Sequence, residues 1–351
     1  MVKQVKQRTM GARALAAALL LGALGVALQS PPRCLRSRAL QAPCLRSRAR
    51  LLATNAAITT DAPPPSTATL ARFALPTLGA WLVSPLMSLV DTAVVGRSAS
   101  ALELAALGPG TMVGDSLAYF CSFLSVATTN MIATARAENG DPAPIFGTAV
   151  RLAVLCGLAS ACAQIAGGRW VLTRYTAAES AAVVQPAYEY VRARACGAPF
   201  ALLIKVSIAS RLAAKDAATP LVAVAGAGVL NLAGDLLCVP AFGVAGAAWA
   251  TVVSEAACAC FLLRRSRLPG GAARRLLPSR ADVARFAVFA KPLLVTLAGK
   301  IATYSSLAHV ATAAGVASTA AHRVLMCVYW FFWRVLRRPI FLELTFHRAA
   351  A

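Results

Sequence analysis

The sequence predicts an all-α polytopic membrane protein, and three observations support this class. Hydrophobic residues make up 58% of the 351 residues and charged residues only 14%. Apolar runs of about 20 residues, long enough to cross a bilayer as a helix, recur after residue 71. The net charge is +22, but the basic residues gather in the N-terminal segment, in loops and near the C-terminal end. This pattern is typical of loop bias in a membrane protein and argues against a nucleic-acid partner.

Residues 1–62 read as a targeting segment. The first 60 residues contain ten Lys and Arg and no Asp or Glu. The apolar stretch Ala14–Leu28 behind a basic start resembles a signal peptide, and the acid-free, arginine-containing stretch after it resembles an organelle transit peptide. This order predicts delivery to a plastid envelope; the alternative is a disordered tail with a chance apolar run. Residues 63–70, which are rich in proline, are expected to form a linker.

Eight apolar segments are expected to cross the lipid bilayer as helices. Most contain no more than one charged residue, while the fourth contains Lys205 and Arg211 and has Arg192 and Arg194 just before it. The predicted helices are Phe73–Val95, Leu107–Ala135, Leu152–Gly168, Ala195–Ala214, Ala217–Val239, Gly243–Leu263, Pro292–Ala314 and Val316–Trp333.

The predicted helices group into one whole lobe and the start of a second. Phe73–Pro76 (FALP) resembles Phe289–Pro292 (FAKP), which suggests the parallel repeats found in transporters. The tail continues with RVLRRPIFLELTFHRAAA, which is basic and unlike a further apolar helix. We therefore expect a second lobe truncated after its second helix, and a chain of this length that does not transport on its own. The expected units are an amino-terminal lobe over 71–265, a basic inter-lobe loop over 266–285, a partial carboxy-terminal lobe over 286–333 and an atypical tail over 334–351.

Carboxylates inside the apolar segments are the strongest functional signal. Asp91 is the only charged residue between Leu75 and Val95, and a charge there must face a protein interior or a water-filled cavity. Pro76 and Pro85 in the same helix each remove a backbone donor and favour a bend. Asp235 follows Asn231 by four residues, so both lie on one helical face, where an amide can serve either the ionised or the protonated acid.

Other polar residues in the apolar segments allow two interpretations each. Asp115 is either a second acid in a cavity or a cap near a kinked helix end, and Lys300 is a candidate for the cavity of the second lobe. Lys205 and Glu255 are expected either to form an ion pair between helices or to lie at a membrane boundary. The ten cysteines include no CxxC and no zinc spacing, and no histidine has a paired acid or nucleophile. We therefore expect no metal, no cofactor and no enzyme active site.

An ordered series of motifs resembles the multidrug and toxic compound extrusion (MATE) transporters. The resemblance covers about Arg72 to Trp333 and falls in the DinF-like branch, to which plant chloroplast proteins belong. The matching stretches are PLMSLVDTAVVGR (85–97), LELAALGPG (102–110), FLSVATTNMIATA (123–135), KDAATP (215–220), NLAGDLL (231–237), FGVAGAAWATVVS (242–254), KPLLVTLAGK (291–300) and STAAHRVLMCVYWFFW (318–333).

The resemblance implies a fold of two six-helix lobes around a cavity and an activity of exporting organic compounds in exchange for H+ or Na+. It points to Asp91, Asn231 and Asp235 as the cation site of the amino-terminal lobe, and Thr251 is a weaker candidate for the same site. Glu255 departs from the neutral residue expected there. The partners would be an organic small molecule and the bilayer, with the oligomeric state left open. Two alternatives remain, a flippase for a lipid-linked saccharide and a truncated product that does not transport.

Overall fold

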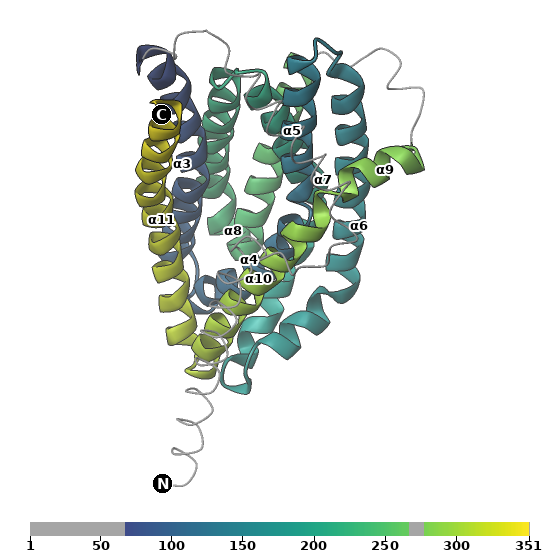
Figure 1. The fold of residues 1–351 in the computed structure, drawn as a ribbon. Helices are drawn as coiled ribbons and strands as arrows, with labels where there is room; N and C mark the ends of the chain where they lie inside the picture. Colours follow the sequence, from purple (N-terminus) through teal and green to yellow (C-terminus); the bar gives the residue numbers. More distant parts are fainter. Residues whose placement is uncertain (1–66, 267–276, 351) are drawn as a thin grey trace, which may run out of the picture.

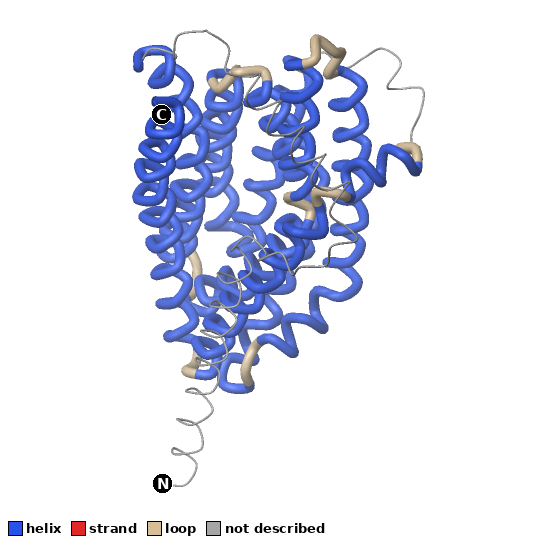
Figure 2. The backbone as a smooth tube through the Cα atoms, in the orientation of Figure 1, coloured by secondary structure: helices blue, strands red, loops and turns tan. Residues whose placement is uncertain are grey.

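The computed structural model describes residues 67–266 and 277–350, with side chains for 71–266, 277–290 and 293–333. Every regular element in these ranges is helical (Figure 1 and Figure 2), which confirms the predicted all-α class. Six helical stretches of this part are long and apolar enough to cross a membrane. The predicted targeting segment lies outside the described residues.

The first predicted helix is longer than expected. Helix α3 spans Thr67–Ser98 and continues through Pro76 and Pro85. It packs against α8 and α11, and Figure 1 shows α3 and α11 side by side although they are far apart in the sequence. Asp91 therefore lies on a helix that touches two later parts of the chain.

The second predicted helix, Leu107–Ala135, is wrong as a single helix. The structure has α4 over Ala101–Phe120 and α5 over Phe123–Ala137. The Ser122 N–H donates to Tyr119 O instead of Ala118 O, and the Lys205 ammonium donates to the Ala118 carbonyl at 3.2 Å. The lysine thus satisfies an acceptor that the break leaves open, which explains a charged residue in an apolar helix.

The fourth predicted helix begins too late. Helix α6 spans Ala143–Tyr175, the 3₁₀ helix η1 spans Ala178–Val183 and α7 spans Val184–Ala213. The first turns of α7 bury small and aromatic side chains, among them Ala187 and Tyr190, and α7 packs against α4 and α6. Arg192 and Arg194 therefore lie inside α7, although the sequence predicted that they lie just before the helix.

The fifth and sixth predicted helices form an antiparallel pair within α8, Ala218–Arg265. The pair turns at Gly243, whose backbone has φ 55° and ψ −139°. A Cβ added at Gly234 would lie 2.8 Å from the Ala250 Cβ, and one added at Gly246 would collide with the Cys238 backbone oxygen. These small residues allow the two backbones to approach closely, which confirms the predicted division near residue 243.

The last helices differ from the prediction mainly in their bounds. A short helix that was not predicted, α9, spans Arg280–Ala287 within the basic loop and begins with a capping box between Ser279 and Asp282. Helix α10 spans Ala290–Ala313, close to the expected range. Helix α11 spans Val316–Ala350, so the predicted end at Trp333 is wrong. The chain turns between α10 and α11 at Gly315, where φ is 94°.

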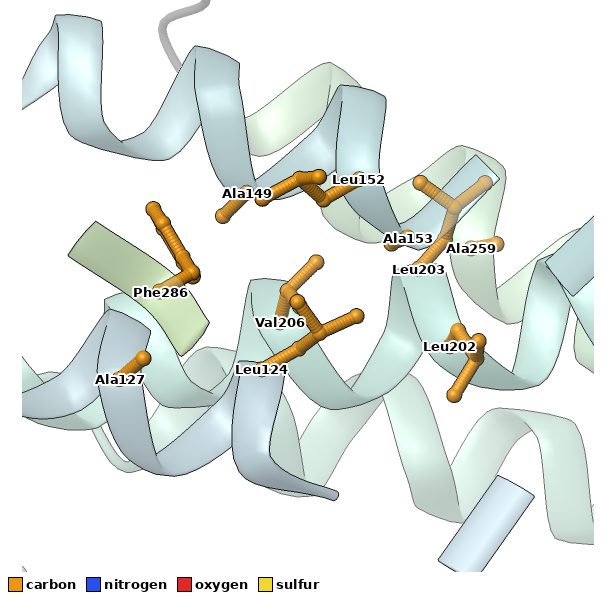
Figure 3. Packing of buried hydrophobic residues seen from close by; sticks show 10 residues of the cluster. All are labelled: Leu124, Ala127, Ala149, Leu152, Ala153, Leu202, Leu203, Val206, Ala259 and Phe286. Atoms are coloured by element: carbon orange, nitrogen blue, oxygen red, sulfur yellow. The ribbon is translucent and has the colours of Figure 1, made fainter. Parts of the chain in front are cut away.

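One apolar core joins α5, α6, α7 and the short helix α9. Phe286 of α9 is only 2% exposed and packs against side chains from all three of the longer helices, and Figure 3 shows it beside Ala127, Ala149 and Val206. Burying a phenylalanine removes a large apolar area from water. This cluster holds the short helix α9 against helices that precede it in the chain.

Candidate functional site

Three polar residues meet between α3 and α8, and we call them the acid cluster: Asp91, Asn231 and Asp235. The Asn231 Nδ2 donates to Asp91 Oδ1 at 3.3 Å. Asn231 is 1% exposed and Asp235 is 0% exposed. The helical spacing of four residues places Asn231 and Asp235 on the same face of α8, as the sequence predicted.

Asp235 is the least satisfied member of the acid cluster. Among the described residues, neither of its carboxylate oxygens has a hydrogen-bond partner of ordinary geometry. Its carboxyl group is close enough to Asp91 for the two to interact electrostatically. A buried carboxylate without a partner is unfavourable unless it takes a proton or meets a cation. The acid cluster can therefore accept either one.

Thr251 is not drawn into the acid cluster. Its hydroxyl donates to the Ala247 carbonyl of its own helix at 2.9 Å. No hydrogen bond within the described residues links it to Asp91 or Asp235. Its intrahelical bond is typical of a threonine in an apolar helix.

A cavity of about 490 Å³ lies between α3, α4, α10 and α11, and we call it the four-helix cavity. Each helix lines it with residues spaced three or four apart, as one helical face requires. The polar and aromatic side chains of its wall include Trp81, Ser88, Thr111, Asp115, Tyr119, Lys300, Tyr304, Arg323, Trp330 and Trp333.

Both predicted cavity residues, Asp115 and Lys300, lie on the wall of the four-helix cavity. Asp115 is 3.7 Å from Arg194 Nη2, and its side chain is 51% exposed. Lys300 is also exposed. The third charged residue on the wall is Arg323, which the sequence analysis did not single out.

Arg323 connects the last helix to the first two helices of the described chain. Its Nη1 donates to Thr111 Oγ1 of α4 at 3.1 Å, and its Nη2 donates to Ser88 Oγ of α3 at 3.0 Å. Cys327, one turn later, lies 3.3 Å from Thr92 Oγ1. The signal that would have found Arg323 is a lone guanidinium in the apolar run STAAHRVLM, judged by the same rule that selected Asp91.

The expected pairing of Glu255 with Lys205 is wrong. Glu255 Oε2 accepts from Arg194 Nη1 at 2.9 Å, and the same guanidinium reaches Asp115. Lys205 instead binds the Ala118 carbonyl. The departure at Glu255 therefore has a structural partner, which sequence reasoning missed because Arg194 was assigned to a loop.

Comparisons with known proteins identify relatives of this chain. The MatE family model matches residues 76–255. Protein DETOXIFICATION 47, chloroplastic, of Arabidopsis thaliana is 36% identical over 269 residues, which cover 74% of this chain and 49% of that protein. DNA damage-inducible protein F of Escherichia coli is 29% identical over 187 residues, covering 52% of this chain and 40% of that protein. The chain thus spans about half or less of the curated relatives it matches.

A solved structure shows the same fold at low sequence identity. The inward-facing conformation of a multidrug resistance MATE family transporter of the MOP superfamily matches with a TM-score of 0.62 and 19% identity, covering 72% of this chain and 60% of that one. The family model begins within α3 at Pro76, ends within α8 at Glu255 and includes the whole acid cluster. On this evidence the chain belongs to the MatE family, the multidrug and toxic compound extrusion proteins.

Proposed function

We propose that this chain supplies the ion-coupling helices of a secondary active antiporter that exports organic compounds in exchange for H+ or Na+. The observation that carries the proposal is the acid cluster. Two carboxylates on different membrane helices lie close together, and Asn231 joins α8 to Asp91 of α3 by a hydrogen bond. Protonation or cation binding changes the charge of this contact, so it changes how α3 is held against α8.

The position of the acid cluster on α3 suggests how ion binding changes the wall of the cavity that would hold the solute. Asp91 lies three residues after Ser88, which lines the four-helix cavity. Pro85 lies one turn earlier on the same helix and also lines the cavity. A helix is weakest to bending where proline removes a backbone bond. Movement of α3 relative to α8 would therefore alter the cavity wall.

The proposed location is a plastid envelope. The Arabidopsis relative DETOXIFICATION 47 bears the word chloroplastic in its name, and the targeting pattern of residues 1–62 points to the same organelle. A fluorescent reporter fused behind these residues is expected to reach plastids. A reporter that stays in the cytosol, or reaches only the cell surface, contradicts this location.

A lipid-linked saccharide flippase fits the cavity less well. A pyrophosphate carrier needs a wall lined by many Arg and Lys, whereas the described wall contains Lys300 and Arg323 with Asp115. The acid cluster would also have no role in a flippase that is not coupled to an ion. We therefore favour ion-coupled antiport.

The test is an ion-binding measurement on the purified chain. Na+ is titrated at several pH values, and binding is followed by the rise in unfolding temperature and by the release of protons into a weakly buffered solution. Wild type is expected to bind one of the two ions, and Asp91→Asn and Asp235→Asn are each expected to abolish that response. Asp216→Asn, an aspartate of the α7–α8 loop, is the matched control and keeps it.

Reconstitution into vesicles provides the second arm of the test. In a longer version of the chain that carries a whole second lobe, ion movement driven by an organic solute is expected to disappear in both acid-cluster variants, while protein content in the membrane stays unchanged. An ion response of wild-type size in both Asp91→Asn and Asp235→Asn would overturn the assignment of the acid cluster.

A further inference from the structure

We propose that the four-helix cavity takes an organic anion with an aromatic body, and that Lys300 and Arg323 are the residues that bind its acidic group. This inference rests on the proposed function, because it assigns a solute class to the same carrier. It concerns the cavity between α3, α4, α10 and α11 and is independent of which ion the acid cluster binds.

The wall of the four-helix cavity contains two positively charged side chains. Lys300 and Arg323 both line the cavity, and neither has a carboxylate within 4.0 Å among the residues with described side chains. The acid of the wall, Asp115, already lies beside Arg194, and Arg194 is also bound to Glu255. Two cations thus remain without an ion pair, while the acidic side chain on the wall has one.

Arg323 is held in place by uncharged hydroxyl groups. Its two terminal nitrogens donate to the hydroxyl groups of Thr111 and Ser88. Hydroxyl oxygens orient a guanidinium without neutralising its charge, because they are uncharged acceptors. Asp91 is near enough to interact electrostatically with Arg323, but the two form no ion pair within 4.0 Å in the described part of the chain. The positive charge therefore remains available to a ligand.

Aromatic side chains form much of the apolar part of the cavity wall. Tyr304 of α10 and Trp330 of α11 have ring centroids 4.9 Å apart, with their planes tilted by 51°. Trp81 and Trp333 also line the cavity. Aromatic rings form favourable offset or edge contacts with another flat apolar group. A carboxylate or other acidic group at Lys300 and Arg323, with a ring among these side chains, matches both parts of the wall.

An organic cation fits this arrangement poorly. It would enter a partly enclosed space beside two positive side chains, and like charges repel more strongly away from bulk water. Arg and Lys are instead the ordinary partners of carboxylates, and the planar guanidinium binds them in a fixed geometry. The difference between the two solute classes should therefore be large enough to measure directly.

The experiment compares two probes of the same shape and opposite charge, 2-naphthoate and 2-naphthylmethylammonium. Binding to the purified full chain in a neutral detergent is measured by equilibrium dialysis at low ionic strength, with detergent alone as the blank. Wild type is expected to bind naphthoate about tenfold more tightly than the cation. Lys300→Gln and Arg323→Gln are each expected to weaken naphthoate binding by about tenfold, as loss of one charge-assisted hydrogen bond implies.

Further variants separate binding from folding. Arg169→Gln removes one positive charge from an exposed position outside the cavity and is expected to leave both affinities unchanged. Arg323 also joins α11 to α3 and α4, so helix content and unfolding temperature of its variant are measured beside wild type, and the Lys300 variants decide the outcome if that variant is less stable. Lys300→Glu has no such contact to lose, and it should reverse the preference toward the cationic probe.

Four results would overturn the inference: tighter binding of the cation by wild type, no binding of either probe, naphthoate binding by Lys300→Gln equal to wild type, or no change of preference in Lys300→Glu. Failure of the proposed function is read separately. It would appear as an ion response in Asp91→Asn and Asp235→Asn, which leaves the naphthoate measurement untouched.

Discussion

The acid cluster and the four-helix cavity share helix α3, but the described charged side chains that lack an ion pair have opposite signs in the two regions. In the acid cluster, the half-buried Asp91 of α3 accepts a hydrogen bond from Asn231, which is buried on α8 together with Asp235. Ser88, three residues before Asp91 on α3, lines the four-helix cavity. Among the described side chains, the charged residues of this cavity that have no ion pair are the cations Lys300 and Arg323. Helix α3 therefore contributes Asp91 to an acidic site and Ser88 to the wall of a basic one.

This difference teaches how the chain can keep two ligands apart. The acid cluster is small and buried, which suits a proton or a bare cation. The cavity has a volume of about 490 Å³ and aromatic walls, which suits an organic solute. Opposite signs of charge would also keep the coupling ion out of the cavity and an organic anion out of the acid cluster.

The largest expected effect tests the ion pairs that leave the cavity basic. Arg194→Met strands Glu255, whose side chain is only 18% exposed, and releases Asp115 at the cavity wall. Removing one partner of a buried pair destabilises a protein by about 3–5 kcal/mol. We expect a correspondingly lower unfolding temperature in detergent. We also expect weaker naphthoate binding, because Asp115 then opposes the charge of Lys300.

A double variant isolates the cause of that loss. In Arg194→Met with Glu255→Met, no charge is left buried at that position, so most of the lost stability should return. The weaker naphthoate binding should persist, because Asp115 remains without its partner. Stability that stays low in the double variant would contradict the ion-pair explanation.

The next effect concerns the link between the two regions. Glu103 at the start of α4 accepts from the Val244 N–H of α8 at 3.1 Å, beside Gly243 with its φ of 55°. An added Cβ at Gly243 would collide with Glu103 Oε1. Gly243→Ala is expected to destabilise the fold by about 1–3 kcal/mol through backbone strain, plus the loss of that hydrogen bond.

The position of the changed residue allows a matched comparison. Gly226→Ala, in the regular part of α8 where an added Cβ meets nothing within 4 Å, should instead be neutral or slightly stabilising, because alanine favours helix. Thermal unfolding of the two variants side by side measures the difference. A Gly243→Ala variant as stable as Gly226→Ala would show that the turn does not need glycine.

The sequence predicted the helical class and the acid cluster for the same physical reason. A lone carboxylate in an apolar run is unfavourable, so Asp91 and Asp235 stand out without any knowledge of their neighbours. The spacing of Asn231 and Asp235 placed both on one face. The turn near Gly243 was visible because two apolar runs of membrane length met there.

The remainder depended on contacts between distant residues. The carbonyl that the break after Phe120 leaves open is satisfied by Lys205, which is 87 positions from Ala118 in the chain, and no local pattern reveals this partner. Arg194 was assigned to a loop because a charge was taken to end an apolar helix, but its partners Asp115 and Glu255 are on other helices. The partners of Arg323, Thr111 and Ser88, are 212 and 235 positions away in the chain, so its role in joining α11 to α4 and α3 is likewise invisible in the local sequence.

A smaller effect, of opposite sign, tests whether the acid cluster is kept for function. Asp235 is buried and its oxygens lack hydrogen-bond partners among the described residues, so Asp235→Asn removes an unfavourable buried charge and keeps the shape. We expect the variant to be more stable by about 1–2 kcal/mol near neutral pH, although it loses the ion response. Thermal unfolding in the absence of Na+ measures this. A clear loss of stability would mean that Asp235 is a structural residue.

The smallest effect comes from the same substitution in an aspartate that has partners. Asp216, in the loop before α8, accepts from the Thr219 N–H at 3.0 Å and pairs with Arg211 at 3.2 Å.

Partial burial raises the pKa of Asp216, but the hydrogen bonds from Thr219 and the charge of Arg211 outweigh it and hold the pKa below 3.8. A depressed folded-state pKa means that the carboxylate stabilises the fold at neutral pH and stops doing so as the pH falls below about 3.8. Asp216→Asn keeps an oxygen for the Thr219 N–H but loses the charge beside Arg211, so it should lower stability by about 0.2–1 kcal/mol at pH 7. Unfolding curves at pH 7, pH 5 and pH 3 should show a difference from wild type that is smaller at pH 3 than at the two higher values. If Asp216→Asn and Asp235→Asn changed stability in the same direction at pH 7, the contrast between a satisfied and an unsatisfied carboxylate would fail as an explanation of the acid cluster.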